Sequence, residues 1–372
     1  MGSPIRILQV VVNMNRGGAE TLIMNLYRNI DRSKVQFDFL TCKEGVFDSE
    51  IINMGGKIHR IPYISDVGHI KYIKELNRFF ATNPDYEVVH SHMDKMSGLI
   101  LRAAKKAGVP VRISHSHNTQ SEGGLTTKLY KWYAGEFIKI NATNFFACSR
   151  QAAQWLFAEK SKLATIVRNG IEQEQFLYST QIRSQVRKEL KINEETIVIG
   201  HVGRFCHQKN HTVLLEIFTR FNKLQKNSLL ILVGDGPLFA EIKQKIRYLN
   251  LEGKVMLLGI RADISRLLQG FDIFLFPSLH EGLPVSLIEA QGAGLPCIIS
   301  DRISKEVDMG LNLVEFVNLN EISEWTNIIN QKIALKGIRE SSLNSLSEKG
   351  YNIRDTANQI EDFYLKVSGG GR

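Results

Sequence analysis

The chain has 372 residues, of which 43% are hydrophobic and 23% charged, and its formal net charge is +9. This length suits two α/β domains, and the composition is that of an ordinary globular protein. No segment approaches the roughly 20 consecutive apolar residues that a membrane-spanning helix needs. The apolar segment Ile5–Val12 is too short for the core of a signal peptide with a cleavage site, so we predict a first strand there and expect a cytoplasmic protein. Its positive charge favours anionic partners: phosphates, nucleic acid or an acidic membrane face.

Short β-branched segments alternate with helical patterns along the whole chain. In the first half the predicted strands are Ile5–Val12, Val35–Cys42, Lys57–Ile61, Glu87–His92, Val111–Ser116, Asn144–Cys148 and Thr165–Arg168. The helical patterns between them include Ala19–Ile30, His69–Ala81, Lys95–Ala107 and Thr126–Ile140. In the second half the predicted strands are Ile197–Val202, Leu229–Val233, Val255–Leu258, Ile273–Phe276, Pro296–Ile299 and Leu313–Phe316. This alternation predicts parallel sheets with crossover helices.

A polar stretch from Asn169 to Thr180 interrupts the alternation, and a new helix, Gln181–Leu190, follows it. We therefore predict a first domain at residues 1–175 and a second at residues 176–353. An amphipathic helix, Asp355–Val367, ends the pattern. The four cysteines lie far apart along the chain, which favours core thiols over a metal site.

The first candidate ligand loop contains Gly17 and Gly18, directly after the first strand. Glycines let the backbone approach a ligand, and a helix N-terminus offers N–H groups to phosphate or sugar oxygens. An ordinary strand-to-helix turn explains the pattern equally well. The full G-x-G-x-x-G fingerprint is missing, and no acidic residue closes the second strand. Both absences weaken the alternative of a nicotinamide-dependent oxidoreductase.

The second candidate loop follows strand Ile197–Val202 and carries Arg204 and Lys209. In doubly wound sheets, ligands bind at the carboxyl ends of the strands. Two cations at that place suit a diphosphate, with arginine as a fork and lysine as a point charge. A solvated basic turn is the simpler interpretation of this loop taken alone.

The third candidate is the segment that begins at Pro277, after the most apolar strand of the second half. Pro284 fits the first turn of a helix, which leaves the N–H groups of Val285 and Ser286 for phosphate. Glu289 then falls among apolar helix neighbours and needs a hydrogen-bonding partner such as a ribose diol. Glu281 precedes the helix, where it could face a bound sugar. The alternatives are a helix-dipole acid for Glu281 and an exposed helix position for Glu289.

Histidines form the fourth signal. His90 and His92 end one strand, and His115 and His117 end the next. Zinc binding is one interpretation, but no cysteine or carboxylate cluster accompanies the histidines. We favour polar histidines at the wall of a binding site. An Asp-x-Asp pair that could hold a cation on a diphosphate is also missing, so basic and helix-terminus groups would have to neutralise the phosphates.

These motifs, in this order, resemble the family 4 glycosyltransferases, which are retaining enzymes of the GT-B fold. The strongest is the Glu-x7-Glu element from Glu281 to Glu289. It is accompanied by Gly203-Arg204 with Lys209, Gly234-Asp235-Gly236-Pro237, Asn169-Gly170-Ile171 and Gly17-Gly18-Ala19-Glu20. The resemblance covers nearly the whole chain. One departure is Asn210, where many members carry glycine after the lysine.

The resemblance implies two Rossmann-like doubly wound domains that face a central cleft, with a C-terminal helix within residues 354–372 crossing back to the first. It implies a retaining, metal-independent enzyme without a cofactor. His117 would face the transferred sugar, with His115 as second choice, and Glu281 would contact the donor sugar. The other expected donor-binding residues are Gly17, Gly18, Arg204, Lys209, Arg261, Gly282, Leu283, Val285, Ser286 and Glu289. Of these, Arg204 and Lys209 would bind the diphosphate, Glu289 the ribose and the loop at Arg261 the base.

Within the family, the run from Val111 to Thr119 is similar to bacterial capsule and exopolysaccharide transferases. That similarity implies a UDP-sugar donor and a saccharide or lipid-linked acceptor. The alternatives are a sugar-nucleotide epimerase of the same fold and, on charge alone, a nucleic-acid-binding protein, for which no recognisable module is present.

The segment from Lys128 to Ile140 mixes cations and aromatic residues on a predicted helix. Such a face could rest on the anionic inner face of a cell membrane. An amphipathic helix with its aromatic side chains in the core is the slightly favoured interpretation.

Overall fold

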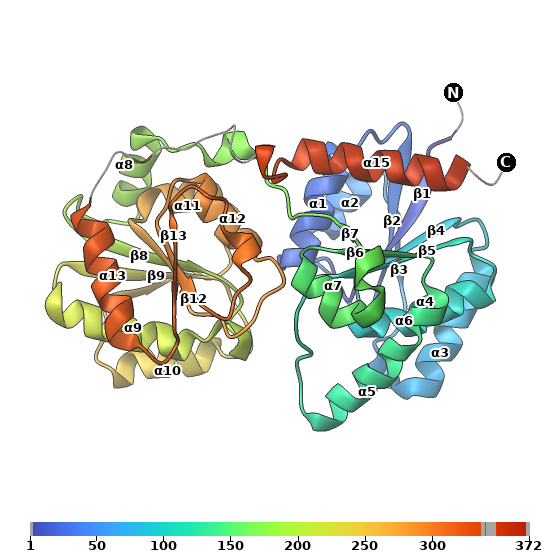
Figure 1. The fold of residues 1–372 in the computed structure, drawn as a ribbon, viewed down its shortest axis with the longest axis horizontal. Helices are drawn as coiled ribbons and strands as arrows, with labels where there is room; N and C mark the ends of the chain where they lie inside the picture. Colours follow the sequence, from blue (N-terminus) through green and yellow to red (C-terminus); the bar gives the residue numbers. More distant parts are fainter. Residues whose placement is uncertain (1–2, 336–338, 340–346, 370–372) are drawn as a thin grey trace. The chain divides into compact units, whose positions relative to one another are not determined.

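The computed structural model describes residues 3–335, 339 and 347–369. The chain forms two compact units: Met1–Gly170 with Gly350–Arg372, and Ile171–Lys349 (Figure 1). The division therefore falls at Gly170, before the predicted residue 175, and the chain returns to the first unit at Gly350, before residue 354. A Cβ on Gly170 would lie 2.7 Å from Cα of Ile353. The outgoing and returning segments thus lie backbone against backbone, and this contact ties residues from Gly350 onward to the first unit.

The first unit contains a seven-stranded sheet in the order β3-β2-β1-β4-β5-β6-β7, and neighbouring strands are parallel. The strands are β1 Ile5–Val10, β2 Val35–Thr41, β3 Ile58–Arg60, β4 Val88–Ser91, β5 Val111–Ser116, β6 Asn144–Ala147 and β7 Thr165–Ile166. The helices are α1 Gly18–Asn29, α2 Asp48–Asn53, α3 Ile64–Thr82, α4 Ser97–Lys106, α5 Leu125–Glu136, α6 Ile138–Asn141, α7 Arg150–Phe157 and α15 Ile353–Gly369.

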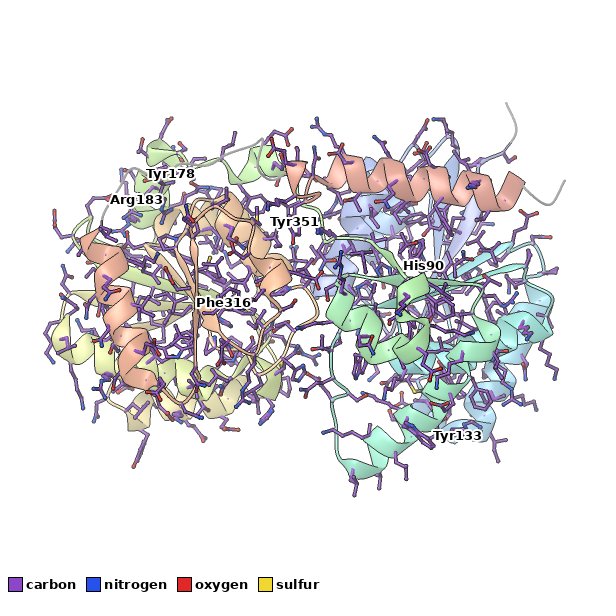
Figure 2. The ribbon with its side chains drawn as sticks, in the orientation of Figure 1. His90, Tyr133, Tyr178, Arg183, Phe316 and Tyr351 are labelled. Atoms are coloured by element: carbon purple, nitrogen blue, oxygen red, sulfur yellow. The ribbon has the colours of Figure 1, made fainter. Side chains whose placement is uncertain are left out.

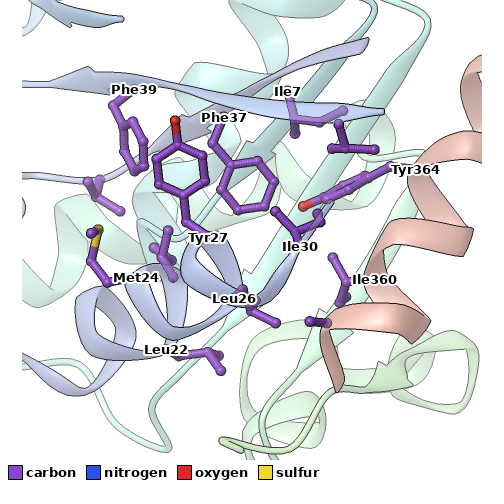
Figure 3. Packing of buried hydrophobic residues seen from close by; sticks show 14 of the residues in the cluster. Ile7, Leu22, Met24, Leu26, Tyr27, Ile30, Phe37, Phe39, Ile360 and Tyr364 are labelled. Carbon is purple, nitrogen blue, oxygen red and sulfur yellow. The ribbon is translucent and has the colours of Figure 1, made fainter. Parts of the chain in front are cut away.

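Both faces of this sheet are buried, as parallel sheets require. Successive strand residues face opposite sides, so that Ile7 packs into one apolar cluster and Leu8 into the other. The first cluster includes α1, α2 and α15, and the second includes α3, α4 and Ala134 of α5. Figure 3 shows how Ile360 and Tyr364 of α15 join the first cluster beside α1. The final helix is therefore part of the core of the first unit.

The second unit contains a six-stranded parallel sheet in the order β10-β9-β8-β11-β12-β13. Its strands are β8 Ile197–Val202, β9 Ser228–Val233, β10 Val255–Leu257, β11 Ile273–Phe276, β12 Cys297–Ser300 and β13 Val314–Val317. Its helices are α8 Thr180–Glu189, α9 His211–Leu224, α10 Phe239–Tyr248, α11 Ile264–Gly270, α12 Val285–Gly292 and α13 Ile322–Ala334. Trp325 of α13, Phe218 of α9 and Leu230 of β9 lie in its main apolar cluster and are fully buried.

The predicted fold class is confirmed, and each predicted strand is present within a few residues. Two helices differ from prediction. Helix α3 begins at Ile64 rather than His69, because a short preceding turn joins it across a kink at Gly68, where φ is 76°. The predicted helix Thr126–Ile140 divides at Phe137 into α5 and α6.

Candidate functional site

The second unit carries most of the predicted donor-binding residues, in loops that follow its strands, whereas Gly17 and Gly18 lie in the first unit. Strand order reverses between β8 and β11, which lie side by side although β9 and β10 come between them in sequence. In open parallel sheets, ligands bind outside the carboxyl ends of the strands at such a point. The loop after β8 carries Arg204 and Lys209, and the loop after β11 carries Glu281 and leads into α12.

The loop after β8 is fixed at its base by Phe205, which is fully buried. Gly234, after β9, supports it from one side. Its φ is 136°, and a Cβ there would lie 2.1 Å from the carbonyl oxygen of Gly203. Only glycine allows this backbone approach. Arg204 is exposed, and among the described residues its guanidinium has no hydrogen-bond or ion-pair partner, so the fork is available to a ligand.

Asn210 ends this loop and lies in the left-handed region, with φ 53° and ψ 47°. Glycine is the default residue in that region, and asparagine is one of the few others that adopt it routinely. The asparagine side chain also donates a hydrogen bond to the carbonyl oxygen of Pro277, at 3.2 Å. The departure from the family's glycine at this position therefore preserves the loop conformation and adds a link to the loop after β11.

Lys209 and Glu281 join the two loops directly. The Lys209 Nζ lies 2.7 Å from Glu281 Oε1, and it also lies over the ring of Phe276 at 4.5 Å. Both side chains are largely buried, at 14% and 8% exposure. Backbone contacts reinforce the junction, since Leu279 N–H donates to the carbonyl oxygen of Gln208. The sequence predicted two ligand-binding groups here, and the structure shows that they also form an ion pair.

Helix α12 presents one face to solvent. Ser286 and Glu289 are half-buried and three positions apart, whereas the other helix residues are buried. Burial raises the pKa of Glu289 to about 7. Within the described part of the chain its carboxylate has no hydrogen-bond partner, so it suits a ligand that can donate hydroxyl groups.

The start of α12 differs slightly from the prediction. Pro284 is the cap that precedes the helix, rather than a residue of its first turn, and Val285 is the first helical residue. The N–H groups of Val285 and Ser286 still have no acceptor within the helix, as in any first turn. Gly282 and Leu283 lie in the buried loop just before it.

Arg261 lies after β10, at the same edge of the sheet. Its guanidinium already makes two hydrogen bonds of 2.8 Å to Asp263. The hydrogen bond to Asp263 raises the pKa of the Arg261 guanidinium. The side chain is thus engaged within the protein, while the preceding backbone, from Gly259, forms the loop surface.

In the first unit, strand order reverses between β1 and β4. Gly17 caps α1 and Gly18 is its first residue, so the glycine loop lies at the carboxyl end of β1. The two histidine motifs end β4 and β5, which are neighbours in the sheet. The predicted glycine and histidine residues therefore follow strands that meet at one edge.

The four histidines belong to a continuous line of hydrogen bonds, which we call the histidine chain. In order, its members are His117, His92, Gln9, Tyr364, His90 and His115. Burial lowers the pKa of His117 to about 3, and it holds the pKa values of the other three histidines well below the usual value for an imidazole. All four imidazoles are therefore neutral near pH 7. Sequence reasoning missed Gln9 and Tyr364.

Three of these histidines lie close enough together to resemble a metal site. One nitrogen from each of His90, His92 and His115 lies within 4.8 Å of the others. Both ring nitrogens of His90 and of His92, however, already participate in hydrogen bonds within the chain. Mutual hydrogen bonding accounts for the arrangement better than a shared ion.

A cavity of about 200 Å³ lies beside the histidine chain within the first unit. Its lining includes Glu20, His92, Asp94, Lys131 and Trp155. Burial raises the pKa of Asp94 to about 6, and its carboxylate accepts a hydrogen bond from the backbone N–H of His117 at 3.3 Å. Asp94 has a φ of 46°, which asparagine and aspartate tolerate better than most residues. Asp94 follows His92 by two positions in the sequence, and this position could have indicated that it lies near the histidines.

The interpretation that the aromatic residues of the segment from Lys128 to Ile140 lie in the core is wrong for Trp132 and Tyr133, whereas Tyr130 and Phe137 pack against the second cluster of the first unit. Only Ala134 of α5 is buried. Leu129, Trp132 and Tyr133 are exposed at 65%, 55% and 43%. Figure 2 shows Tyr133 on α5, whereas His90 lies inside the unit. We call the exposed apolar residues Leu125, Leu129, Trp132 and Tyr133 of α5, together with Ile140 of α6, the α5 patch. Across the described residues, no helix is both long and apolar enough to cross a bilayer.

Comparison with known proteins agrees with this fold. The family "Glycosyl transferase 4-like domain" matches residues 17–170, and "Glycosyl transferases group 1" matches residues 182–310. Among solved structures, HepE from Anabaena, in complex with UDP and glucose, superposes with a TM-score of 0.75 at 21% identity and covers 98% of each chain. These findings define the fold as that of a GT-B glycosyltransferase.

The relatives make the assignment more specific. A Bacillus subtilis (strain 168) protein named as a glycosyltransferase, EpsF, is 39% identical over 368 residues, which is 96% of each chain. The capsular polysaccharide biosynthesis glycosyltransferase CapH of Staphylococcus aureus is 28% identical, over 97% of this chain and 99% of CapH. The chain belongs to the family 4 glycosyltransferases. Neither family description names an epimerase, so that alternative finds no support.

Proposed function

We propose that the protein transfers a sugar from a UDP-sugar to a saccharide or lipid-linked saccharide during bacterial polysaccharide assembly, with retention of anomeric configuration and without a metal ion. The observation that carries this proposal is the grouping of Arg204, Lys209, Glu281 and α12 at the β8/β11 reversal point of the second unit.

The diphosphate is the chemically demanding part of the donor, because negative charge grows on it as the glycosidic bond breaks. Groups already placed to receive that charge lower the barrier without reorganising during the reaction. The free fork of Arg204 and the N–H groups of Val285 and Ser286 are such groups, and Lys209 adds two further N–H donors beyond its bond to Glu281. Glu289 is proposed to accept hydrogen bonds from the ribose diol.

Retention of configuration is proposed to follow from attack on the same face from which the diphosphate leaves. The departing phosphate takes the proton of the acceptor hydroxyl, so no side chain has to act as a covalent nucleophile. Glu281 fits a sugar-binding role better than a nucleophilic one, since its ion pair with Lys209 stabilises a negative charge in place. His117 is proposed to contact a hydroxyl of the transferred sugar.

The choice of donor and acceptor rests on relatives. HepE was solved with UDP and glucose. An Escherichia coli relative that is 29% identical, over 89% of this chain and 90% of its own length, is named as UDP-Gal:alpha-D-GlcNAc-diphosphoundecaprenol alpha-1,3-galactosyltransferase. These names support a uridine donor and a diphospholipid-linked acceptor for the present protein.

A lipid-linked acceptor requires contact with a membrane, and we propose that the α5 patch provides it. Exposed apolar side chains on one helix insert at the level of the lipid headgroups, and nearby lysines attract anionic lipids. Lys128 and Lys139 are exposed within this segment, and Lys105 and Lys106 are exposed at the end of α4. The proposed location is the cytoplasmic face of the membrane.

Product analysis tests the proposal. Purified protein is incubated with UDP-sugars and a diphospholipid-linked sugar acceptor in the presence of a chelator. We expect UDP release, an extended acceptor, and an α linkage by NMR when the donor is an α-linked sugar nucleotide. An inverted linkage, or activity that needs added metal, would refute the mechanism. An isomerised sugar nucleotide without UDP release would identify an epimerase instead.

A further inference from the structure

The histidine chain ends at two ring nitrogens, His117 Nδ1 and His115 Nε2. Both are buried, and neither has a hydrogen-bond partner within the described ranges of the chain. A neutral imidazole has one N–H group and one lone pair, so each end is either a donor or an acceptor. The direction of the hydrogen bonds inside the histidine chain decides whether each end donates or accepts.

Gln9 sets this direction, because its amide has a donor end and an acceptor end. Its Oε1 accepts from His92 Nε2–H at 2.8 Å. The other nitrogen of a neutral His92 then carries a lone pair, and it accepts from His117 Nε2–H at 2.8 Å. His117 Nδ1 is therefore left with a lone pair, and it can accept a hydrogen bond from a hydroxyl group.

The same amide sets the proton positions in the other half of the histidine chain. Gln9 Nε2 donates to the hydroxyl of Tyr364 at 3.2 Å, and that hydroxyl donates its own proton to His90 Nδ1 at 2.6 Å. His90 Nε2–H then donates to His115 Nδ1 at 3.1 Å. Each of the four histidines thus carries its proton on Nε2, and rotation of the Gln9 amide would move all four protons to Nδ1.

We propose that Gln9 and Tyr364 are positioning residues, which hold His117 in the Nε2–H tautomer so that its Nδ1 accepts a hydrogen bond from a hydroxyl of the transferred sugar. The identification of a sugar hydroxyl as the partner of His117 rests on the proposed function, whereas the tautomer of His117 follows from the hydrogen bonds alone. Charged forms do not compete, because burial keeps the imidazoles neutral. Tyr364 belongs to α15, so the final helix controls a residue at the carboxyl end of β5.

Nitrogen-15 NMR of the histidine rings tests the tautomer without substrate. In the wild-type protein we expect each of the four histidines to carry its proton on Nε2. In Tyr364→Phe the Gln9 amide loses its acceptor and can rotate to donate to His92, so His117 should show a population protonated on Nδ1. Gln9→Leu removes the hydrogen bonds to both His92 and Tyr364, so it should give a similar mixture of the two His117 tautomers.

Tyr27→Phe is the matched control. Tyr27 lies in the same apolar cluster and stacks on Phe37, whose ring also contacts Tyr364 (Figure 3). Its hydroxyl bonds to Gln36 at 3.0 Å and takes no part in the histidine chain. This variant should therefore leave the His117 tautomer and the rate of sugar transfer unchanged.

For Tyr364→Phe we expect kcat/KM for the sugar donor to fall in proportion to the His117 population that is protonated on Nδ1, which is about tenfold when that form makes up about nine tenths of the total. Melting should change no more than in Tyr27→Phe. A wild-type His117 protonated on Nδ1, or an unchanged tautomer in both Tyr364→Phe and Gln9→Leu, would overturn the proposal. If the tautomer shifts as expected but the wild-type protein transfers no sugar, the proposed function fails and the positioning role stands.

Discussion

Lys209 and Glu281 lie 72 positions apart in the sequence, yet their side chains meet at 2.7 Å at the strand reversal of the second unit. The contact joins the loop that we propose binds phosphate to the loop that we propose binds sugar. Both groups are largely buried, so the ion pair offsets part of the cost of removing two charges from water.

Lys209→Met should therefore lower both stability and activity. Removing Lys209 takes its charged hydrogen-bond partner from a buried carboxylate, which costs about 1–3 kcal/mol of unfolding free energy. Glu281→Gln keeps a hydrogen-bond acceptor for Lys209 and should cost less. Urea unfolding of the two single variants and the double variant measures the coupling. Additive effects of the two substitutions would show that the ion pair has no energetic role.

Glu289 should make nucleotide binding depend on pH. Its pKa is raised to about 7, and the ionised form is the stronger partner for two ribose hydroxyls, because both of its oxygens are acceptors and neither carries a proton. UDP affinity of the wild-type protein should rise as pH increases to about 7 and then level off. In Glu289→Gln the part of the pH dependence that comes from Glu289 should disappear. The ionisation of UDP itself affects the affinity of both proteins equally, so it cancels in the comparison. Parallel pH profiles for the two proteins would exclude the ribose role.

The same group should affect stability without ligand. In the unfolded chain a glutamate ionises near its ordinary pKa of about 4.3, whereas folded Glu289 holds its proton to about pH 7. Between these values the folded state binds more protons, so stability falls as pH rises. Glu289→Gln should therefore be more stable than the wild type above about pH 7 and equal to it below about pH 4, as measured by denaturant unfolding.

Asn210 should tolerate glycine but not alanine. At φ 53°, an alanine would adopt the left-handed conformation at a cost of roughly 1–2 kcal/mol, and the bond to Pro277 would also be lost. Asn210→Gly also loses the hydrogen bond to Pro277, but glycine adopts the left-handed conformation without strain. Thermal unfolding should therefore rank wild type and Asn210→Gly above Asn210→Ala. Equal melting of the glycine and alanine variants would mean that the loop conformation differs from that described.

The α5 patch should bind anionic vesicles. Sedimentation with phosphatidylglycerol vesicles should recover the wild-type protein at low salt, and Trp132→Glu should reduce that recovery without loss of stability, because the side chain is exposed. Leu224→Glu, which replaces an exposed leucine of the second unit, is the control and should bind as the wild type does. Failure of the wild type to sediment, or equal recovery of both variants, would remove the membrane role.

The sequence was sufficient to predict features that depend on short segments. Strand and helix alternation predicted both sheets, and Arg204, Lys209 and Glu281 each follow a strand that can be recognised locally. Pairing across the fold could not be predicted in the same way. Gln9 and Tyr364 are 355 positions apart, and nothing beside either residue indicates a shared hydrogen bond. The exposure of Trp132 was the less favoured of two alternatives, because an apolar residue on a helix has the same pattern whether it faces a core or solvent.

Calorimetric titration with UDP, in the presence of a chelator, tests the central claim most directly. We predict that the wild-type protein binds UDP and that Arg204→Ala binds it at least about tenfold more weakly, a loss of about 1.4 kcal/mol or more. Arg204→Lys, which keeps the charge but loses the fork, should fall between them. Wild-type affinity in Arg204→Ala would contradict the assignment of the diphosphate to the loop after β8.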